Sequence, residues 1–200
     1  MQREKSWKKE LREWIVSIAA ALMVVFLLRT FLFQVIRVDG DSMDATLADN
    51  ERLFVSVLDV RLSGVNRGDV VICHYPNRGR TDFVKRVVAM PGDRVYRENF
   101  ATHVVYDLVK EDGSVETVDE ILDAYIPGEY HPYLNSPDYA PYTLKEDEYF
   151  VVGDNRYHSH DSRDWNDSDP SMDVGPISGD MIVGRVCNVI WPIDSMRSVE

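Results

Sequence analysis

One serine stands out as a possible nucleophile. Ser42 lies in the stretch VDGDSMDATL, residues 38–47, just after the flexible Gly40 and between Asp41 and Met43. A serine hydroxyl needs a base to take its proton before it can attack a carbonyl carbon. No histidine lies nearby in the sequence, and no GxSxG motif surrounds the serine. Ser42 is therefore either a turn residue or a nucleophile whose base comes from a distant segment.

Histidine is the usual base for a serine nucleophile. The chain offers five candidates, which are His74, His103, His131, His158 and His160. None lies in a recognisable triad motif. The last two belong to the polar run RYHSHDSR and are most simply exposed loop residues.

Lysine is the alternative base, provided that burial keeps its amine neutral. Desolvation lowers the pKa of an amine because the charged form loses its hydration. Lys85 lies in the apolar run DFVKRVVAM. Strand alternation would place it on the same face as Phe83, Val87 and Ala89, with Arg86 on the other face. A lysine in a strand is ordinarily exposed, so these residues alone leave its role open.

The segments that carry these residues predict strands. Short β-type runs such as ERLFVSVLDV, TDFVKRVVAM, EYFVVGD and DMIVGRVCNVIWP alternate with turn sequences such as NRGD, PNRGR and MPGD. They predict a mainly β domain of packed antiparallel sheets. Residues 97–147 alternate more weakly and are interpreted as an inserted β subdomain. Only VDEILDAY, residues 118–125, shows some helical period.

The N-terminal segment is basic and then apolar. Fifteen uncharged residues, 14–28, extend to twenty-three at residue 36 if Arg29 is included. An uncleaved membrane anchor, a cleavable signal peptide and a buried core helix all fit such a run. The anchor is favoured because no small-x-small site follows the run. Five cations within residues 1–12 place that end in the cytoplasm. We therefore expect a cytoplasmic N-terminus at 1–13, one transmembrane helix at 14–36 and an extracytoplasmic catalytic domain at 37–200.

The charge distribution limits the possible partners. The formal net charge is −12, and residues 1–36 carry six cations and three glutamates, so the rest of the chain carries −15. Nucleic acid is excluded as a partner because phosphate binding needs a basic surface.

Two features are open to more than one interpretation. Cys73 and Cys187 could form a disulfide, but both lie in apolar runs, which favours free thiols. Residues 161–175 carry five aspartates and suggest a calcium loop. Counting from Asp164, however, the glycine and glutamate positions of an EF-hand hold Asp169 and Gly175. A solvated acidic loop without metal is therefore favoured.

Four sequence blocks together resemble the type I signal peptidases. They are SMDATL at 42–47, RGDVV at 67–71, KRVVAMPGD at 85–93 and GDNRYHSHDSR at 153–163, 31 residues in the family's order, with the serine block directly after the apolar segment. The resemblance implies a Ser–Lys protease on a β-rich fold that needs no cofactor or metal. Its partners would be preprotein signal peptides and membrane lipid.

The resemblance also implies residue roles. Ser42 corresponds to the nucleophile and Lys85 to the general base, while Ser159 corresponds to a serine that hydrogen-bonds and orients the lysine. Asp161 and Arg163 correspond to a supporting ion pair, and residues 153–156 to a structural turn. Of the substrate-binding residues, Val38, Met43 and Val84 would line shallow pockets for small side chains at positions −1 and −3 of the peptide. The peptide would lie extended beside the strand from Asp82 to Lys85.

The chain departs from the family pattern at several points. Ala45 replaces the usual proline, Ala89 replaces the usual glycine, and about eight residues at 167–174 are inserted. Gly40 stands where some members have a serine that donates to the oxyanion. The oxyanion would then depend on backbone N–H groups, chiefly that of Ser42.

Other functions fit parts of this pattern. They are a different Ser–Lys protease, such as a LexA-like autoprotease or a pilus maturation peptidase, an inactive module that only binds export substrates, and an anchored β-rich structural protein. A LexA-type repressor would need a DNA-binding domain, and this chain has an apolar segment instead. The joint presence of Ser42, Lys85 and Ser159 argues against an inactive module.

Overall fold

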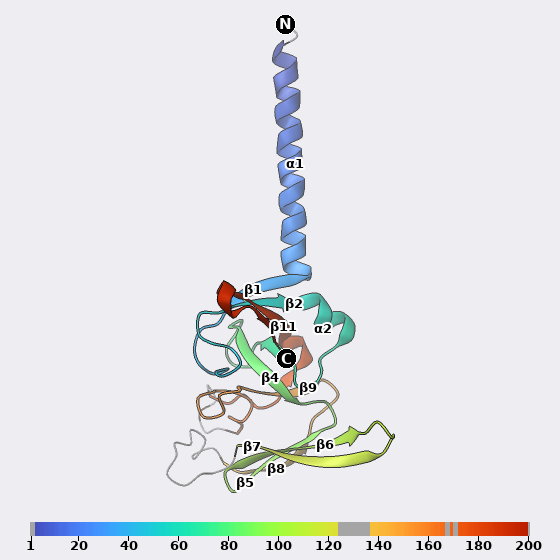
Figure 1. Ribbon diagram of the computed structural model, residues 1–200, viewed down its shortest axis with the longest axis vertical. Helices are drawn as coiled ribbons and strands as arrows, with labels where there is room; N and C mark the ends of the chain where they lie inside the picture. The colour runs from blue at the N-terminus through green and yellow to red at the C-terminus, as the bar shows by residue number, and fades with distance from the viewer. Residues whose placement is uncertain (1–2, 124–136, 167–168, 170–171, 200) are drawn as a thin grey trace.

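The computed structural model describes residues 3–123, 137–166, 169 and 172–199. Figure 1 shows one long helix projecting from a body made of two antiparallel sheets. The mainly β body agrees with the sequence prediction. Parts of the expected insertions at 97–147 and 167–174 lie outside the described residues.

The apolar N-terminal segment is not a single helix as far as residue 36. Helix α1 spans Arg3–Phe31, and strand β1 follows at Phe33–Arg37. The change occurs because β1 pairs antiparallel with β2, Arg52–Ser56, and the rings of Phe33 and Phe54 lie 5.4 Å apart. The helix therefore ends before the predicted boundary at residue 36, and the last residues of the predicted anchor form most of β1. Among the described residues, the structure has no helix that combines the length and apolar character needed to cross a membrane.

The larger sheet carries most of the sequence blocks. Its strand order is β1-β2-β11-β3-β4-β9-β10, with β12 paired to β11. The strands not yet given are β3 Val70–Cys73, β4 Phe83–Ala89, β9 Glu148–Val152, β10 Ile177–Ser178, β11 Ile182–Trp191 and β12 Arg197–Ser198. Short 3-10 helices η1, Gly179–Met181, and η2, Ile193–Ser195, flank β11. Strand β4 thus lies inside the sheet, between β3 and β9.

The second sheet lies at the end of the body far from α1 (Figure 1). Its order is β7-β6-β5-β8, formed by β5 Arg94–Glu98, β6 Ala101–Val109, β7 Val115–Asp123 and β8 Tyr139–Thr143. The helical period at 118–125 is misleading, because pairing with β6 holds residues 115–123 in a strand. A shared core joins the two sheets and includes Ala89 and Phe150 from the larger sheet and Val95 and Val104 from the second.

Strand β2 ends earlier than its sequence suggests. The run ERLFVSVLDV predicts a strand over residues 51–60, but helix α2 occupies Val57–Ser63. The Ser56 side chain accepts a hydrogen bond from the N–H of Asp59 and so caps the helix. An unrecognised cap therefore explains the error.

Both cysteines are free thiols, as the sequence favours. Cys73 is fully buried in β3, and burial raises the pKa of its thiol to about 12. Cys187 lies in β11 and is half-buried.

Candidate active site

The structure brings Ser42 and Lys85 into direct contact. Lys85 lies in the middle of β4, opposite Val71 of β3, and its side chain is only 2% exposed. Its Nζ lies 2.7 Å from the Oγ of Ser42, which is half-buried. A strand interior therefore supplies the amine, and a turn 43 residues away in sequence supplies the hydroxyl.

Burial controls the protonation of Lys85. Desolvation is the largest effect and lowers the pKa of its amine below the ordinary 10.5, while the Asp161 carboxylate acts in the opposite direction. The net effect is a lowered pKa. Because a neutral amine can accept a proton, Lys85 has the character of a base.

A tight turn presents Ser42. The N–H groups of Thr46 and Leu47 both donate to the carbonyl of Met43, and Ala45 has a φ of 23°. Proline is fixed near a φ of −65° and could not adopt this conformation. The absence of the family's usual proline at position 45 therefore matches the local backbone.

The loop after β9 is hydrogen-bonded to this turn and holds it in place. The N–H of Asn155 donates to the carbonyl of Ser42 at 3.1 Å, and the Asn155 side chain donates to the carbonyl of Asp41 at 3.1 Å. Asp154 accepts hydrogen bonds from Thr46 Oγ1 at 2.6 Å and from the Arg86 guanidinium at 2.8 and 2.9 Å. Burial would raise the pKa of Asp154, but these donors outweigh it and the pKa is lowered. Asp154 thus links the serine turn to β4.

Gly153 allows three segments to meet. A Cβ at this position would lie 2.2 Å from Ser159 Oγ and 2.4 Å from the carbonyl oxygen of Ser42. Real Cβ contacts are never so short, so only glycine fits here. The glycine of the GDNR block therefore has a steric role in addition to any turn.

Asp161 and Arg163 form a fully buried ion pair beside this contact. The Arg163 Nε and Nη2 donate to the two oxygens of Asp161 at 2.8 and 2.9 Å, and the Gly153 N–H donates to Asp161 at 2.9 Å. Burial alone would raise the pKa of Asp161, but Arg163, Ser159 and the Gly153 N–H together outweigh it, and the pKa is lowered. Asp161 is therefore a carboxylate held close to the base.

Comparison with known proteins identifies the family. The family described as signal peptidase, peptidase S26, matches residues 11–191. The chain belongs to the type I signal peptidases. Signal peptidase IB of Staphylococcus aureus (strain Mu50) is 33% identical over 192 residues, 95% of this chain and 94% of that protein. Signal peptidase I P of Bacillus subtilis subsp. natto is 34% identical over 199 residues, 99% of this chain and 98% of that protein. A solved signal peptidase I structure from Enterococcus faecalis V583 is 21% identical and covers 60% of this chain and 95% of its own, with a TM-score of 0.37.

Membership confirms the prediction that this chain is a signal peptidase enzyme. The expected orienting serine, however, makes no hydrogen bond to Lys85 in this structure. Ser159 is buried, its Oγ has no partner in good hydrogen-bond geometry among the described residues, and its side chain acts on Asp161, whose pKa it helps to lower. The hydrogen bond from Lys85 goes to Ser42 instead. An orienting role for Ser159 therefore remains a prediction.

Some of the residues predicted to bind substrate lie in or against the hydrophobic core, and others are exposed. Val38 and Met43 are buried in one core cluster, and the partly buried Val84 packs against it. Asp82 is more exposed and faces His74, with 3.0 Å between His74 Nε2 and the carboxylate. Gly40, with a φ of 103°, donates its N–H to Asp49 at 3.0 Å. The apolar residues thus share one core cluster, whereas Asp82 immediately precedes β4.

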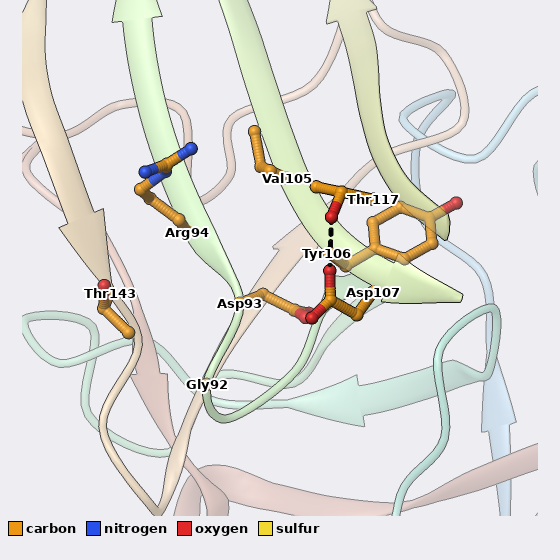
Figure 2. Close-up of a pocket in the computed structure, with 8 residues that line it drawn as sticks. All are labelled: Gly92, Asp93, Arg94, Val105, Tyr106, Asp107, Thr117 and Thr143. Carbon is orange, nitrogen blue, oxygen red and sulfur yellow. Dashed lines mark hydrogen bonds between the residues drawn. The ribbon is translucent and has the colours of Figure 1, made fainter. Parts of the chain in front are cut away.

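A hollow of about 480 Å³ lies away from these residues (Figure 2). It is formed by the second sheet and the turn before β5, and Thr117 donates to Asp107 across it at 2.7 Å. Its lining residues are Gly92, Asp93, Arg94, Val105, Tyr106, Asp107, Thr117 and Thr143, and none of them is a predicted site residue.

Three histidines face carboxylates rather than Ser42. His74 pairs with Asp82, His103 with Asp119 at 3.0 Å, and His160 with Asp164 at 2.7 Å. His158 is exposed, and His131 lies outside the described residues.

The acidic loop is only partly solvated. Asp161 and Asp164 are buried, and Asp164 accepts a hydrogen bond from the N–H of Asp161 at 3.1 Å. Asp173 accepts one from the N–H of Asn166 at 2.8 Å. The expectation of a solvated loop is therefore wrong for Asp161 and Asp164, because their carboxylates hold the loop together.

Replacing Gly153 tests the steric argument. We expect Gly153→Ala to lower kcat by about 100-fold, because the added methyl group displaces the Ser42 carbonyl or Ser159. Peptide cleavage and melting temperature would be measured together. Gly179→Ala is the control, since its Cβ would meet chiefly the flexible Asp147 side chain, away from Ser42. Wild-type cleavage by Gly153→Ala would contradict the argument.

Proposed function

We propose that this chain is a membrane-anchored serine endopeptidase that removes signal peptides from exported preproteins, with Ser42 as nucleophile and neutral Lys85 as general base. The observation that carries the proposal is the 2.7 Å contact between a buried amine and a serine hydroxyl. The family match and the two curated relatives support the reaction.

The chemistry follows from that contact. As Ser42 Oγ attacks the scissile carbonyl carbon, its proton passes to Lys85 Nζ and a tetrahedral oxyanion forms. Collapse breaks the C–N bond, and the lysine ammonium gives the proton to the departing amine. Water then attacks the acyl-enzyme, Lys85 takes the water proton, and the proton returns to Ser42 as the ester bond breaks.

Backbone donors suit the oxyanion. The N–H of Gly40 is already donated to Asp49, whereas no hydrogen bond links the Ser42 N–H to another described residue. The Ser42 N–H is therefore the donor that we assign to the oxyanion.

An open strand edge suits an extended substrate. Strand β3 pairs with β4 along Phe83, Val84, Lys85 and Arg86, but β9 pairs with β4 only from Arg86 onward. Residues 82–85 therefore lack a strand neighbour on the β9 side within the described structure. A peptide adding there would place alternate side chains against Val38, Met43 and Val84.

Substrate scanning tests this binding mode. We expect leucine at position −1 of a signal peptide to reduce kcat/KM by at least about 100-fold, because buried core residues wall the pocket. Substitutions at −2 should change kcat/KM less than about threefold, since that side chain points away from the sheet. Sequencing of the new N-terminus would confirm the cut. Comparable cleavage with alanine and leucine at −1 would refute the mode.

Replacing the pair tests the catalytic assignment. Ser42→Ala and Lys85→Ala should each lower kcat by about 10⁴-fold, and the double variant should be little worse, because the two residues act as a unit. Lys85→Arg should be inactive because guanidinium stays protonated. In the wild type, the rate should rise with pH through the lowered Lys85 pKa, below 10.5.

Stability separates lost chemistry from lost folding. The pKa of Lys85 is lower in the folded chain than the ordinary 10.5, so folding opposes protonation and its cost shrinks as pH rises toward 10.5. Lys85→Met should therefore be inactive yet melt higher than the wild type at neutral pH, with the difference narrowing at alkaline pH.

If a histidine variant removes the pH limb while Lys85→Ala keeps substantial turnover, that histidine is the base instead.

The exposed apolar side chains of α1 support the proposal that this helix is a membrane anchor. Apolar side chains including Trp14, Ile18, Leu22 and Phe26 are all more than half exposed along α1. The described part of α1 from Trp14 to Phe26 carries no charge, and an exposed apolar helix surface of this kind is ordinarily covered by lipid or protein. We assign α1 to the membrane, with residues 1–13 cytoplasmic and the body outside.

Shortening the chain tests the anchor. A chain beginning at Leu32 keeps the carbonyl that accepts the N–H of Val57 and so keeps β1 in place. It should cleave short peptides within about twofold of the full chain but process membrane-inserted preprotein at least tenfold more slowly, because surface confinement raises effective concentration. Equal losses on both substrates would contradict the anchor, and protease protection of the body in intact cells would reverse the assigned orientation.

A further inference from the structure

A row of polar side chains crosses the second sheet where an apolar row would be ordinary. Tyr139 of β8 is the cross-strand neighbour of Arg97 of β5, which pairs with Thr102 of β6, which pairs with Asp123 of β7. Tyr139, Arg97 and Thr102 are buried, and the Asp123 side chain is 7% exposed. Buried polar groups are costly unless they are paired, so the row needs a reason.

Asp123 joins this row to the candidate active site. Its Oδ1 accepts a hydrogen bond from the Thr102 N–H at 2.9 Å, within the second sheet. Its Oδ2 accepts one from Arg163 Nη1 at 3.2 Å and lies 3.8 Å from Arg97 Nη1. One carboxylate thus binds its own sheet with one oxygen and the loop of the larger sheet with the other.

The chain of contacts that starts at Asp123 continues to the turn that carries Ser42. Arg163 holds both oxygens of Asp161, and Asp161 also accepts the N–H of Gly153. Gly153 in turn lies against the carbonyl of Ser42. The titratable groups that act on Lys85 are Asp161, the Cys73 thiol, Arg163 and Asp154, and Asp161 also acts on Arg156. Asp123 is therefore linked by two ion pairs, through Arg163, to Asp161, whose charge acts on Lys85.

We propose that Asp123 is a positioning residue of the catalytic pair: it holds Arg163 against Asp161, and its charge contributes to the electrostatic environment of Lys85. The proposal rests on the function proposed above and extends it. It gives the second sheet a part in catalysis, through a carboxylate that touches neither substrate nor the reacting atoms.

The expected effect has a definite sign. A nearby carboxylate favours the protonated form of an amine, so removing the Asp123 charge should lower the pKa of Lys85 further. Arg163 would also lose a partner, and the geometry behind Ser42 would loosen. A role limited to folding would lower stability and activity without moving the pH dependence.

The test is the pH–rate profile of Asp123→Asn in the full chain, measured with a signal-peptide substrate. We expect the rising limb, which reports loss of the Lys85 proton, to move down by about half a pH unit or more, and kcat to fall about tenfold. Asp119→Asn is the matched control, because it removes the same charge from the same strand, at a side chain that contacts Tyr96 and His103. Its limb should not move. An unmoved or raised limb in Asp123→Asn, or an equal shift in Asp119→Asn, would overturn the proposal.

A second variant covers the case in which Asp123→Asn folds poorly. Asp123→Glu keeps the charge but displaces the carboxylate, so it should keep the wild-type limb while kcat falls. A downward shift in Asp123→Glu would overturn the proposal. Comparing the wild type with Lys85→Ala distinguishes failure of the proposed function from failure of the role proposed for Asp123. If the wild-type limb does not depend on Lys85, the proposed function fails, whereas a Lys85-dependent limb that ignores Asp123 defeats only this inference.

Discussion

A lysine amine can take a proton from serine only while it carries none itself, and in this protein burial is what lowers the pKa of Lys85. An amine on a surface strand would be charged at neutral pH. The larger sheet avoids this by placing Lys85 on the inner strand β4, paired with Val71 of β3, where the residue is only 2% exposed. The position of β4 in the sheet is thus a chemical requirement as much as a topological one.

Burying one neutral amine brings charged neighbours with it. Asp161 is fully buried near the amine and would by itself favour protonation, so Arg163 is needed to occupy both of its oxygens. Arg86 and Asp154 form a second pair that also ties the serine turn to β4. Buried ion pairs seldom add stability compared with apolar packing. Here they have a geometric result, since they join three segments that are distant in sequence.

The sequence could predict which residues meet in the candidate site but not everything that holds them. The four blocks bring together Ser42, Lys85 and Asp161 because their residue types and order are distinctive. Alternation places Phe83 and Val87 in one core cluster, as expected, but Ala89 joins another, because the pairing of β4 with β9 shifts register between Val87 and Ala89. No sequence pattern predicted the contact between Asp123 and Arg163, because an aspartate at the end of a polar strand is expected to be exposed to solvent. Only the packing of the two sheets buries it. The start of α2 depended on one serine cap, which a strand-like run concealed.

The point where β9 begins to pair with β4 limits what a bound chain can do. A peptide that hydrogen-bonds to the open edge of residues 82–85 meets an occupied edge at Arg86. It must turn away from the sheet at that residue, next to Lys85 and therefore next to Ser42. Under the proposed binding mode, the edge occupied by β9 would limit how far a peptide can slide along β4 and would so set its register against Ser42. Peptide residues beyond this point would have no neighbouring strand, so the sheet would impose sequence requirements on only one side of the cleaved bond.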